Sequence, residues 1–442
     1  MHSSPPAASG GPLRVGLLGL GVVGSGVQRL LLRNAELIAR RAGRAIELRA
    51  IAVRDVARAR AAAGTGAPVV GDAMTVATDP HVDVVVEAIG GCAAARSLVM
   101  AAITHGKHVV TANKALLALH GEEIFAAAQE RGVVVAFEGA VAVSIPIVKA
   151  LREGLAANEI AWLAGIVNGT SNFILTQMRE RGTSFDDALR EAQRLGYAEA
   201  DPAFDVDGVD SAHKLALLAS LAFGSRLAFE QVEVAGIRDV QLVDLQCAER
   251  LGHRLKLIAS ARRHGAKVAL CVGPALVPET CLMARVDGSM NGIVVQGDAA
   301  GQTMYHGAGA GSLETASAVV ADLVEVARLA RVPARDRVPP LGVPREQALP
   351  LAGMASQELS TPHYLRVTLA SGSDLDRVLG VLAAACIRVV AHVDVATREA
   401  ARGVALLTAP APGSALREAI GLLARDGAAE GPVAWLRVET LQ

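Results

Sequence analysis

Residues 13–26 read LRVGLLGLGVVGSG, and this stretch decides the fold of the N-terminal part of the chain. A short apolar strand, LRVGLL, runs directly into Gly19, Gly21 and Gly24, which form a G-x-G-x-x-G turn. The residues that follow, VQRLLLRNAELIARR over 27–41, have the apolar spacing of one helix. A strand, a glycine-rich turn and a helix in this order are typical of a dinucleotide site, in which the pyrophosphate lies at the helix N-terminus.

Further apolar runs follow the turn, with helical segments between them. They are IELRAIAVRD (46–55), HVDVVVEAIGG (81–91), KHVVTAN (107–113) and GVVVAFEG (132–139). Strands that alternate with helices predict an α/β domain with a doubly wound parallel sheet of the Rossmann type. We assign this domain to residues 13–147, after a disordered arm over 1–12, and expect a helix at 310–332 to pack back on it.

The rest of the chain has a different pattern. Longer helices with intervening strands predict an α+β substrate and dimerisation domain over 148–332. The segment 333–360 is rich in proline and charge and is expected to be a linker. The last segment, 361–442, has the order β-α-β-β-α-β, which predicts a ferredoxin-like domain.

Composition limits the class of partner. The 442 residues are 52% hydrophobic and 3% aromatic with a net charge of -1, which gives no electrostatic or stacking reason to bind nucleic acid. The apolar runs stop short of the roughly 18 residues that span a bilayer, so we expect no membrane insertion. A small-molecule partner is therefore expected from the charge and the aromatic content. Five scattered cysteines without a C-x-x-C pair, and a leader without an apolar core, predict a cytoplasmic protein.

The end of the second strand bears on the choice of cofactor. This position normally carries a carboxylate that binds the ribose 2′-hydroxyl of NAD, but here Arg54 precedes Asp55. A cation at this place favours the 2′-phosphate of NADP, with use of NAD also open. The alternative for Arg54 is an ordinary surface arginine in an arginine-rich chain.

Residues 199–214 form an acidic segment that ends in a lysine. It reads EADPAFDVDGVDSAHK, with carboxylates at Glu199, Asp201, Asp205, Asp207 and Asp210. A calcium loop counted from Asp205 lacks the glycine and glutamate that an EF-hand requires. Asp210 and Lys214 are four residues apart and share one face of an otherwise apolar helix. A surface ion pair is the alternative, but the apolar helix favours a partly desolvated lysine whose proton is more easily removed.

Five stretches, in this order, resemble homoserine dehydrogenase. They are VVTANKALLA (109–118), FEGAVAVSIPIVKAL (137–151), GIVNGTSNFILTQM (165–178), EAQRLGYAEADPAFDVDGVDSAHKLALLA (191–219) and GAGAGSLETASAVVADL (307–323). With the glycine-rich turn they spread over most of residues 13–330. The resemblance implies the NAD(P)-dependent interconversion of L-homoserine and L-aspartate 4-semialdehyde in the biosynthesis of threonine, methionine and isoleucine.

The resemblance also implies roles for individual residues. Lys214 would donate and accept the proton, with Asp210 beside it, and Lys114 would be a second catalytic lysine that contacts cofactor and substrate. The substrate would be bound by Glu199, which receives its ammonium, and by Asp205, Asp210, Asn168, Gly169 and Thr170. The cofactor would be bound by Gly19, Leu20, Gly21, Val22, Val23, Gly24, Arg54, Lys114, Gly196 and Gly309.

A monovalent cation such as Na⁺ is implied at the segment after Glu138. By the resemblance its ligands would be Glu138 and the carbonyls of Val141, Val143 and Ile145. The family usually has Ala-Gly-Gly-Ile-Pro here, whereas this chain has a valine and Ser144 in place of the two glycines. A β-branched residue at 143 disfavours the backbone geometry that glycine allows.

Three other enzymes or binding proteins compete with this reading. A semialdehyde dehydrogenase that forms a thioester needs a nucleophilic cysteine in its substrate domain, but the sequence has none between Cys92 and Cys247. A kinase-dehydrogenase fusion needs a large domain before the glycine-rich turn, so we expect the monofunctional form. An inactive amino-acid sensor on the same scaffold is the alternative from another class.

The C-terminal segment 361–442 resembles an ACT domain. This resemblance implies threonine as an effector, bound between paired modules, and a homodimer or homotetramer. ACT domains usually carry an Asp-x-Pro-Gly turn before their first helix, whereas this chain reads ASGSD over 370–374. A module that only dimerises therefore remains an alternative.

Overall fold

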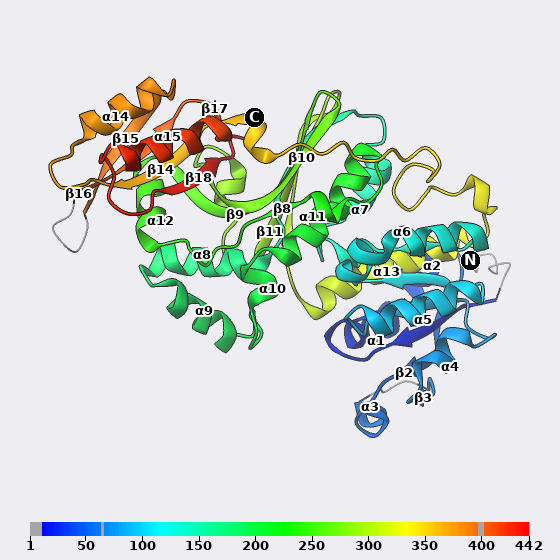
Figure 1. Ribbon diagram of the computed structural model, residues 1–442. Coiled ribbons are helices and arrows are strands. Elements are labelled where there is room, and N and C mark those ends of the chain that lie inside the picture. The colour runs from blue at the N-terminus through cyan, green and yellow to red at the C-terminus, as the bar shows by residue number, and fades with distance from the viewer. Residues whose placement is uncertain (1–10, 63–65, 397–401, 442) are drawn as a thin grey trace, which may run out of the picture. The chain divides into compact units, whose positions relative to one another are not determined.

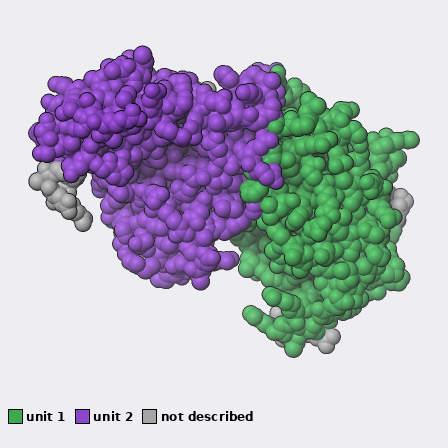
Figure 2. All heavy atoms as spheres, in the orientation of Figure 1, with its two compact units in different colours: residues 1–159, 216–229, 307–351 green, residues 160–215, 230–306, 352–442 purple. Residues whose placement is uncertain are grey.

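The computed structural model describes residues 11–62, 66–396 and 402–441, which form two compact units (Figure 2). Unit 1 comprises residues 1–159, 216–229 and 307–351, and unit 2 comprises residues 160–215, 230–306 and 352–442. Of the arm predicted at 1–12, residues 1–10 lie outside the described residues. Within the described ranges, no helix is both long enough and apolar enough to cross a membrane.

Unit 1 is built on a six-stranded parallel sheet (Figure 1). Its strands are β1 (Leu13–Leu18), β2 (Ile46–Ala52), β3 (Val69–Val70), β4 (Val84–Glu87), β5 (His108–Thr111) and β6 (Val135–Ala136). The strand order β3-β2-β1-β4-β5-β6, with every neighbouring pair parallel, is that of the Rossmann fold. The predicted doubly wound sheet is confirmed.

The helices of unit 1 connect these strands and cover the sheet. They are α1 (Val22–Arg33), α2 (Ala35–Ala42), α3 (Val56–Ala62), α4 (Ala73–Thr78), α5 (Ala93–Thr104), α6 (Lys114–Arg131), α7 (Ile147–Lys149) and α13 (Ser312–Leu329), with short turns η1 (Glu138–Ala140), η2 (Ala150–Gly154) and η5 (Ala334–Asp336). The prediction of one helix over 27–41 is wrong. Asn34 leaves the helical region, with φ of -113° and ψ of 21°, and separates α1 from α2.

The core of unit 1 lies between the sheet and its helices. Val15 and Leu17 of β1 pack in one buried cluster with Val319 and Leu323 of α13. α13 follows β12 by way of a glycine-rich segment, and its N-terminal end lies against α1, where Ser312 Oγ donates to the carbonyl of Val22 (2.6 Å). A helix distant in sequence therefore supports the first turn of α1.

Unit 2 is built on a mixed ten-stranded sheet. Its strands are β7 (Ile160–Ile166), β8 (Glu233–Val234), β9 (His253–His264), β10 (Lys267–Pro278), β11 (Met290–Gly297), β12 (Gly301–Ala308), β14 (His363–Thr368), β15 (Val389–Ala396), β16 (Arg402–Thr408) and β18 (Ala434–Val438). The order is β12-β11-β7-β9-β10-β18-β14-β16-β15, and β8 pairs with β10 off this path. A separate pair consists of β13 (Ser360–Thr361) and β17 (Ala411–Pro412).

The helices of unit 2 carry most of the candidate site. They are α8 (Gly169–Arg181), α9 (Phe185–Arg194), α10 (Ala203–Val206), α11 (Val209–Phe223), α12 (Leu242–Arg250), α14 (Leu375–Ala384) and α15 (Gly413–Arg425), with short turns η3 (Phe229–Gln231), η4 (Leu282–Arg285) and η6 (Ser356–Glu358). α11 begins in unit 2 and its residues from 216 onward belong to unit 1.

The C-terminal elements follow the predicted β-α-β-β-α-β order, as β14, α14, β15, β16, α15 and β18. Their sheet is continuous with the rest of unit 2, because β18 pairs in parallel with β10 at Ala275 and Leu276. Buried side chains add to this connection. Tyr364 donates to Asp244 of α12 (3.0 Å), and Glu439 accepts from Arg262 of β9 (2.7 Å). The ferredoxin-like segment is thus an extension of the main sheet rather than a separate body on a tether.

Candidate active site

The glycine-rich turn has the geometry that a pyrophosphate requires. Gly19 has φ of 96°, and its N–H donates to the carbonyl of Ala52 (2.9 Å), which ties the turn to the end of β2. A Cβ on Gly24 would lie 2.0 Å from the carbonyl oxygen of Gly19, so only glycine fits there. A Cβ on Gly21 would meet nothing within 4 Å, which leaves the N-terminus of α1 open to an anion.

The other predicted cofactor residues in unit 1 surround this turn. Arg54 is exposed, two residues beyond the end of β2. Gly309 lies in the segment that leads to Ser312 and α13, and this segment approaches α1 so closely that a Cβ on Gly26 would lie 2.3 Å from the Ser312 carbonyl oxygen. The residues between the three glycines, Leu20, Val22 and Val23, are partly or fully exposed. The arrangement fits an NAD(P) phosphate group.

A buried carboxylate that the sequence did not reveal orders the next loop. Glu87, at the end of β4, is fully buried and accepts hydrogen bonds from Ile89 N (2.9 Å), Gly90 N (3.2 Å) and Thr111 Oγ1 (2.7 Å). This loop is joined to α6 because Asn113 Nδ2 donates to the Gly91 carbonyl (2.6 Å).

Asn113 also caps α6, since its Oδ1 accepts from Leu116 N (3.1 Å). Lys114, the first residue of α6, is therefore placed at the carboxyl end of the parallel strands, where open α/β sheets bind their ligands. Its side chain is half-buried.

Lys214 lies at the centre of a polar cluster in unit 2. Its Nζ donates to Asp210 Oδ2 (2.8 Å) and to the carbonyl of Val167 (2.7 Å). The side chains of Lys214 and Asp210 are only 8% and 4% exposed. The predicted shared helix face and desolvation are confirmed, and the alternative of a surface ion pair is wrong.

Asn168 joins this cluster to α8. It caps the helix, with Oδ1 accepting from Ser171 N (2.8 Å), and its Nδ2 donates to both Asp205 Oδ1 and Asp210 Oδ2 (2.8 Å each). A buried amide thereby orients two carboxylates from α10 and α11. Four predicted residues, namely Asn168, Asp205, Asp210 and Lys214, are brought together by direct hydrogen bonds.

The remaining predicted residues of unit 2 lie around the start of α8. Thr170 Oγ1 donates to the carbonyl of Tyr197 (2.7 Å), which holds the loop after α9 against the first turn of α8. This loop contains Gly196, with φ of 77°, and Glu199. The Glu199 carboxylate is exposed and makes no hydrogen bond or ion pair to any described residue.

The segment proposed to hold a cation has an unusual backbone. Val143 has φ of 56°, so the expectation that a β-branched residue would stay out of the left-handed region is wrong. Its neighbour Ser144 anchors the segment, since Ser144 Oγ donates to the carbonyl of Ala308 (2.9 Å). The glycine-like conformation is thus retained without glycine.

The Glu138 carboxylate is already engaged, because it accepts from Val148 N (2.8 Å) and Lys149 N (3.0 Å). Burial raises the pKa of Glu138, and these two amides partly offset the rise. Beneath it, Asp322 of α13 accepts from Glu138 N (2.8 Å), and burial raises the pKa of Asp322 to about 7 despite the nearby Lys149. The main-chain carbonyl of Glu138 also accepts a hydrogen bond, from Val141 N (3.5 Å).

Comparison with known proteins gives the family. A family model described as homoserine dehydrogenase matches residues 146–324, and one described as homoserine dehydrogenase, NAD binding domain, matches residues 19–138. A homoserine dehydrogenase of Pseudomonas aeruginosa is 52% identical over 357 residues, which cover 80% of this chain and 82% of that protein. The chain belongs to the homoserine dehydrogenase family.

Other homoserine dehydrogenases match over nearly the whole length. The enzyme of Neisseria gonorrhoeae is 43% identical over 435 residues, 97% of this chain and 99% of that protein. The crystal structure of a homoserine dehydrogenase from Thiobacillus denitrificans has a TM-score of 0.92 at 49% identity and covers 98% of this chain and 99% of that one. The predicted family is confirmed, and the chain is an oxidoreductase with an NAD(P)-binding domain that acts on homoserine and aspartate semialdehyde. This assignment favours the enzyme over the inactive sensor.

Proposed function

We propose that Lys214 exchanges the proton when this homoserine dehydrogenase interconverts L-homoserine and L-aspartate 4-semialdehyde. The observation that carries the proposal is the buried ammonium of Lys214, held between Asp210 Oδ2 and the Val167 carbonyl. Oxidation of the substrate hydroxyl releases one proton as the hydride leaves the same carbon. In its neutral amine form Lys214 can accept that proton, and in its ammonium form it returns the proton in the reverse direction.

Asp210 has a supporting role in this scheme. Its carboxylate stabilises the ammonium form of Lys214 and, through the amide of Asn168, keeps a fixed orientation. The donor is a neutral amide, so it orients Asp210 without placing a further positive charge beside it. The lysine is thereby held in one position in both of its protonation states.

The other predicted substrate residues match the groups that homoserine presents. Homoserine carries an ammonium, a carboxylate and a hydroxyl. The exposed carboxylate of Glu199, together with Asp205, suits the ammonium, while Gly169 and Thr170 supply polar groups of the α8 N-terminus to the carboxylate. Lys114 contributes a second cation toward substrate and cofactor.

NADP is the proposed preferred cofactor, with NAD also used. The bound dinucleotide supplies the acceptor or donor of the hydride. Exposed Arg54, beyond the end of β2, suits a 2′-phosphate. A hyperthermophilic archaeal homoserine dehydrogenase, 25% identical with a TM-score of 0.61 over 71% of this chain, has been solved in complex with NADPH.

We propose a monovalent cation held by Glu138 and by the carbonyls of Val141, Val143 and Ile145. The left-handed backbone at Val143, with φ of 56°, supports this assignment, because it is a conformation that glycine adopts readily. Replacing Na⁺ with a bulky organic cation should then lower thermal stability, as measured by the melting temperature.

For the C-terminal segment we propose threonine binding and a homodimer or homotetramer. Gly372, with φ of 78°, forms a tight turn between β14 and α14, and β15 is the last strand in the described sheet order, with Val390 53% exposed. Deletion of the segment is a poor test, because β18 pairs with β10. Calorimetry with threonine on the whole chain and on a Gly372→Val variant, together with light scattering for the mass, tests both parts.

We also propose a cytoplasmic location, which the absence of a disulfide among all five cysteines supports.

The proton role is tested by steady-state oxidation of homoserine. Lys214→Ala should lower kcat on the order of a hundredfold or more, the scale of a lost general acid or base. Glu199→Ala should act mainly on KM for homoserine, because it binds the substrate in both states. A Lys214→Ala enzyme with near-normal kcat would overturn the assignment.

A further inference from the structure

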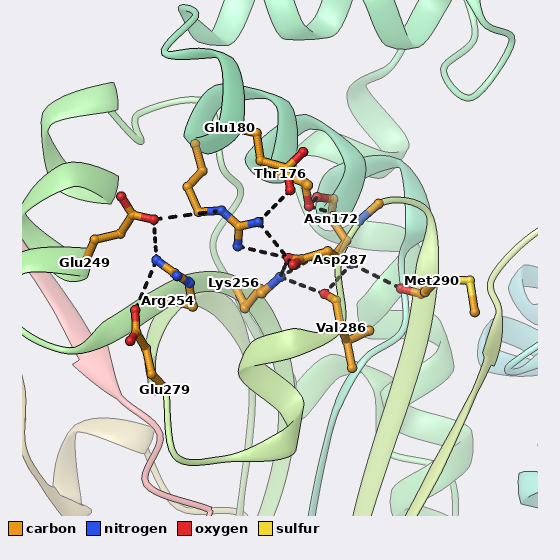
Figure 3. Close-up of polar contacts among 12 residues, drawn as sticks. Asn172, Thr176, Glu180, Glu249, Arg254, Lys256, Glu279, Val286, Asp287 and Met290 are labelled. Atoms are coloured by element: carbon orange, nitrogen blue, oxygen red, sulfur yellow. Dashed lines mark hydrogen bonds and ion pairs between the residues drawn. The ribbon is translucent and has the colours of Figure 1, made fainter.

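Another buried lysine contacts α8 at Asn172, one helical turn beyond Asn168. Lys256 of β9 has a side chain only 2% exposed. Its Nζ donates to the Val286 carbonyl (2.6 Å), Asp287 Oδ1 (2.7 Å) and Asn172 Oδ1 (3.2 Å), as Figure 3 shows for Val286 and Asp287. An ammonium has three hydrogens, and these three acceptors use all of them. Lys256 is therefore a fixed cross-link between β9, α8 and the loop after η4.

The loop over 286–290 is tied to α8 by several side chains. Asn172 Nδ2 donates to the carbonyls of Val286 (2.9 Å) and Met290 (3.2 Å), both drawn in Figure 3. Arg179 makes a two-pronged contact with Asp287, at 3.0 Å from each of its terminal nitrogens. Asn172 and Arg179 are seven residues apart and share one helix face.

The same loop touches the first turn of α8. A Cβ on Gly169 would lie 2.6 Å from the carbonyl oxygen of Ser289, so the loop backbone packs directly on the substrate-side turn. The preceding residue, Asn168, is the one that orients Asp210 toward Lys214. A shift of the loop would therefore move the group that holds the proton-exchanging lysine.

Stability alone is a poor reason to keep this lysine. Burying an ammonium costs free energy of folding, and a well-packed apolar side chain at the same place often stabilises a protein equally well or better. Burial lowers the pKa of Lys256, although the hydrogen bond that Lys256 donates to Asp287 opposes the shift. A charge retained here despite this cost suggests that the hydrogen bonds of Lys256 to Val286, Asp287 and Asn172 are needed.

We propose that Lys256 is a positioning residue for the reaction. It fixes the 286–290 loop on α8, so that Asn168 keeps the Asp210 carboxylate in place to accept the hydrogen bond from Lys214. The inference rests on the proposed role of Lys214. Lys256 itself touches neither the substrate nor the cofactor in this scheme.

The test uses the full-length enzyme with Lys256→Met, which keeps an unbranched side chain, one atom shorter than lysine, and removes the charge. We expect kcat to fall about tenfold, while KM for NADP stays within about twofold because the glycine-rich turn lies in unit 1. The midpoint of the pH profile of kcat/KM for homoserine should move about half a unit or more to lower pH, because a loosened Asp210 stabilises the ammonium less.

Two further variants keep the test decisive. Asp287→Asn keeps the side-chain volume and should give a smaller shift in the same direction, even where Lys256→Met folds poorly. Arg254→Gln is the matched control, since Arg254 pairs with Glu249 and Glu279 at the partly exposed end of the same network (Figure 3). It should leave both kcat and the pH midpoint unchanged.

A purely structural role would lower the melting temperature of Lys256→Met and Asp287→Asn but leave the kcat of the folded fraction and the pH midpoint as in wild type. That result overturns the inference. Lys214→Met is assayed in parallel. If Lys214→Met is nearly as active as wild type, the proposed role of Lys214 fails. If Lys214→Met is inactive but Lys256→Met behaves like wild type, only the proposed role of Lys256 fails.

Discussion

Two lysine clusters flank the first turns of α8, and their contacts are nearly the same in kind. Each lysine is buried and donates to a carboxylate and a main-chain carbonyl, and an asparagine of the α8 region completes each cluster. The carboxylates differ in their second partner. Asp210 receives a neutral amide from Asn168, whereas Asp287 receives the guanidinium of Arg179.

We propose that this difference separates the reactive lysine, Lys214, from the positioning lysine, Lys256. A carboxylate shared between two cations binds both firmly and leaves little freedom to either. We propose that a carboxylate oriented by a neutral amide instead stays responsive to the protonation of its lysine. On this proposal, the second partner of the carboxylate, more than the burial of the lysine, distinguishes the lysine that exchanges protons.

The largest of the remaining effects should come from Arg54, which belongs to neither lysine cluster. It tests whether cofactor binding depends on a residue outside these clusters. Arg54→Ala removes the cation proposed for the 2′-phosphate and should weaken NADP by about 1.5 to 3 kcal/mol, which is roughly 10- to 150-fold. Binding of NAD, and kcat with saturating cofactor, should change little. Isothermal titration with each cofactor measures both affinities, and an equal loss for NAD and NADP would show that Arg54 is structural.

A smaller effect should distinguish the two asparagines. Asn168→Ala removes the amide that orients Asp210 and also the cap of α8, so we expect kcat to fall about tenfold with a stability loss of about 1 kcal/mol. Asn172→Ala removes one of the three acceptors of Lys256 and should lower kcat only about threefold. Steady-state kinetics and chemical unfolding give both numbers, and the reverse order of the kcat losses would contradict the assignment of the clusters.

The smallest effect concerns acid stability. Burial alone would raise the pKa of Asp287, but hydrogen bonds from Arg179 and Lys256 outweigh it and hold this pKa below its usual value. The stabilisation is present above the unfolded pKa of about 4 and is lost as the pH falls through the lower folded value. Asp287→Asn should lack this part of the acid transition, about 1 kcal/mol or less at a partly exposed site. Urea unfolding of both proteins at pH 3 to 6 measures this difference. If the free energy of unfolding has the same pH dependence in Asp287→Asn as in wild type, the prediction is wrong.

Much of the fold was predictable because its signals are local. The run LRVGLLGLGVVG and the alternation after it gave the parallel sheet, and the order of elements after 361 gave the ferredoxin-like segment. Two features were not predictable. The break at Asn34 interrupts a continuous apolar pattern, and the pairing of β18 with β10 joins residues about 160 positions apart, for which periodicity carries no signal.

The candidate site divides in the same way. Asp210 and Lys214 are four residues apart on one helix, so their contact follows from helical spacing. Glu87 looked like the end of an ordinary buried strand, and Lys256 and Asp287 lie 31 residues apart on different elements. The low number of lysines in an arginine-rich chain was the one available hint that Lys256 is retained for a reason.

The most direct test of the contrast between the two lysines is a single-turnover experiment. Lys214→Met and Lys256→Met, each saturated with homoserine and NADP, are followed by formation of reduced nicotinamide across pH 6 to 10. The account predicts that Lys214→Met is slower on the order of a hundredfold or more and loses the rise of rate with pH, while Lys256→Met keeps that rise with a displaced midpoint. A Lys214→Met enzyme that keeps the wild-type rate and pH dependence would contradict it.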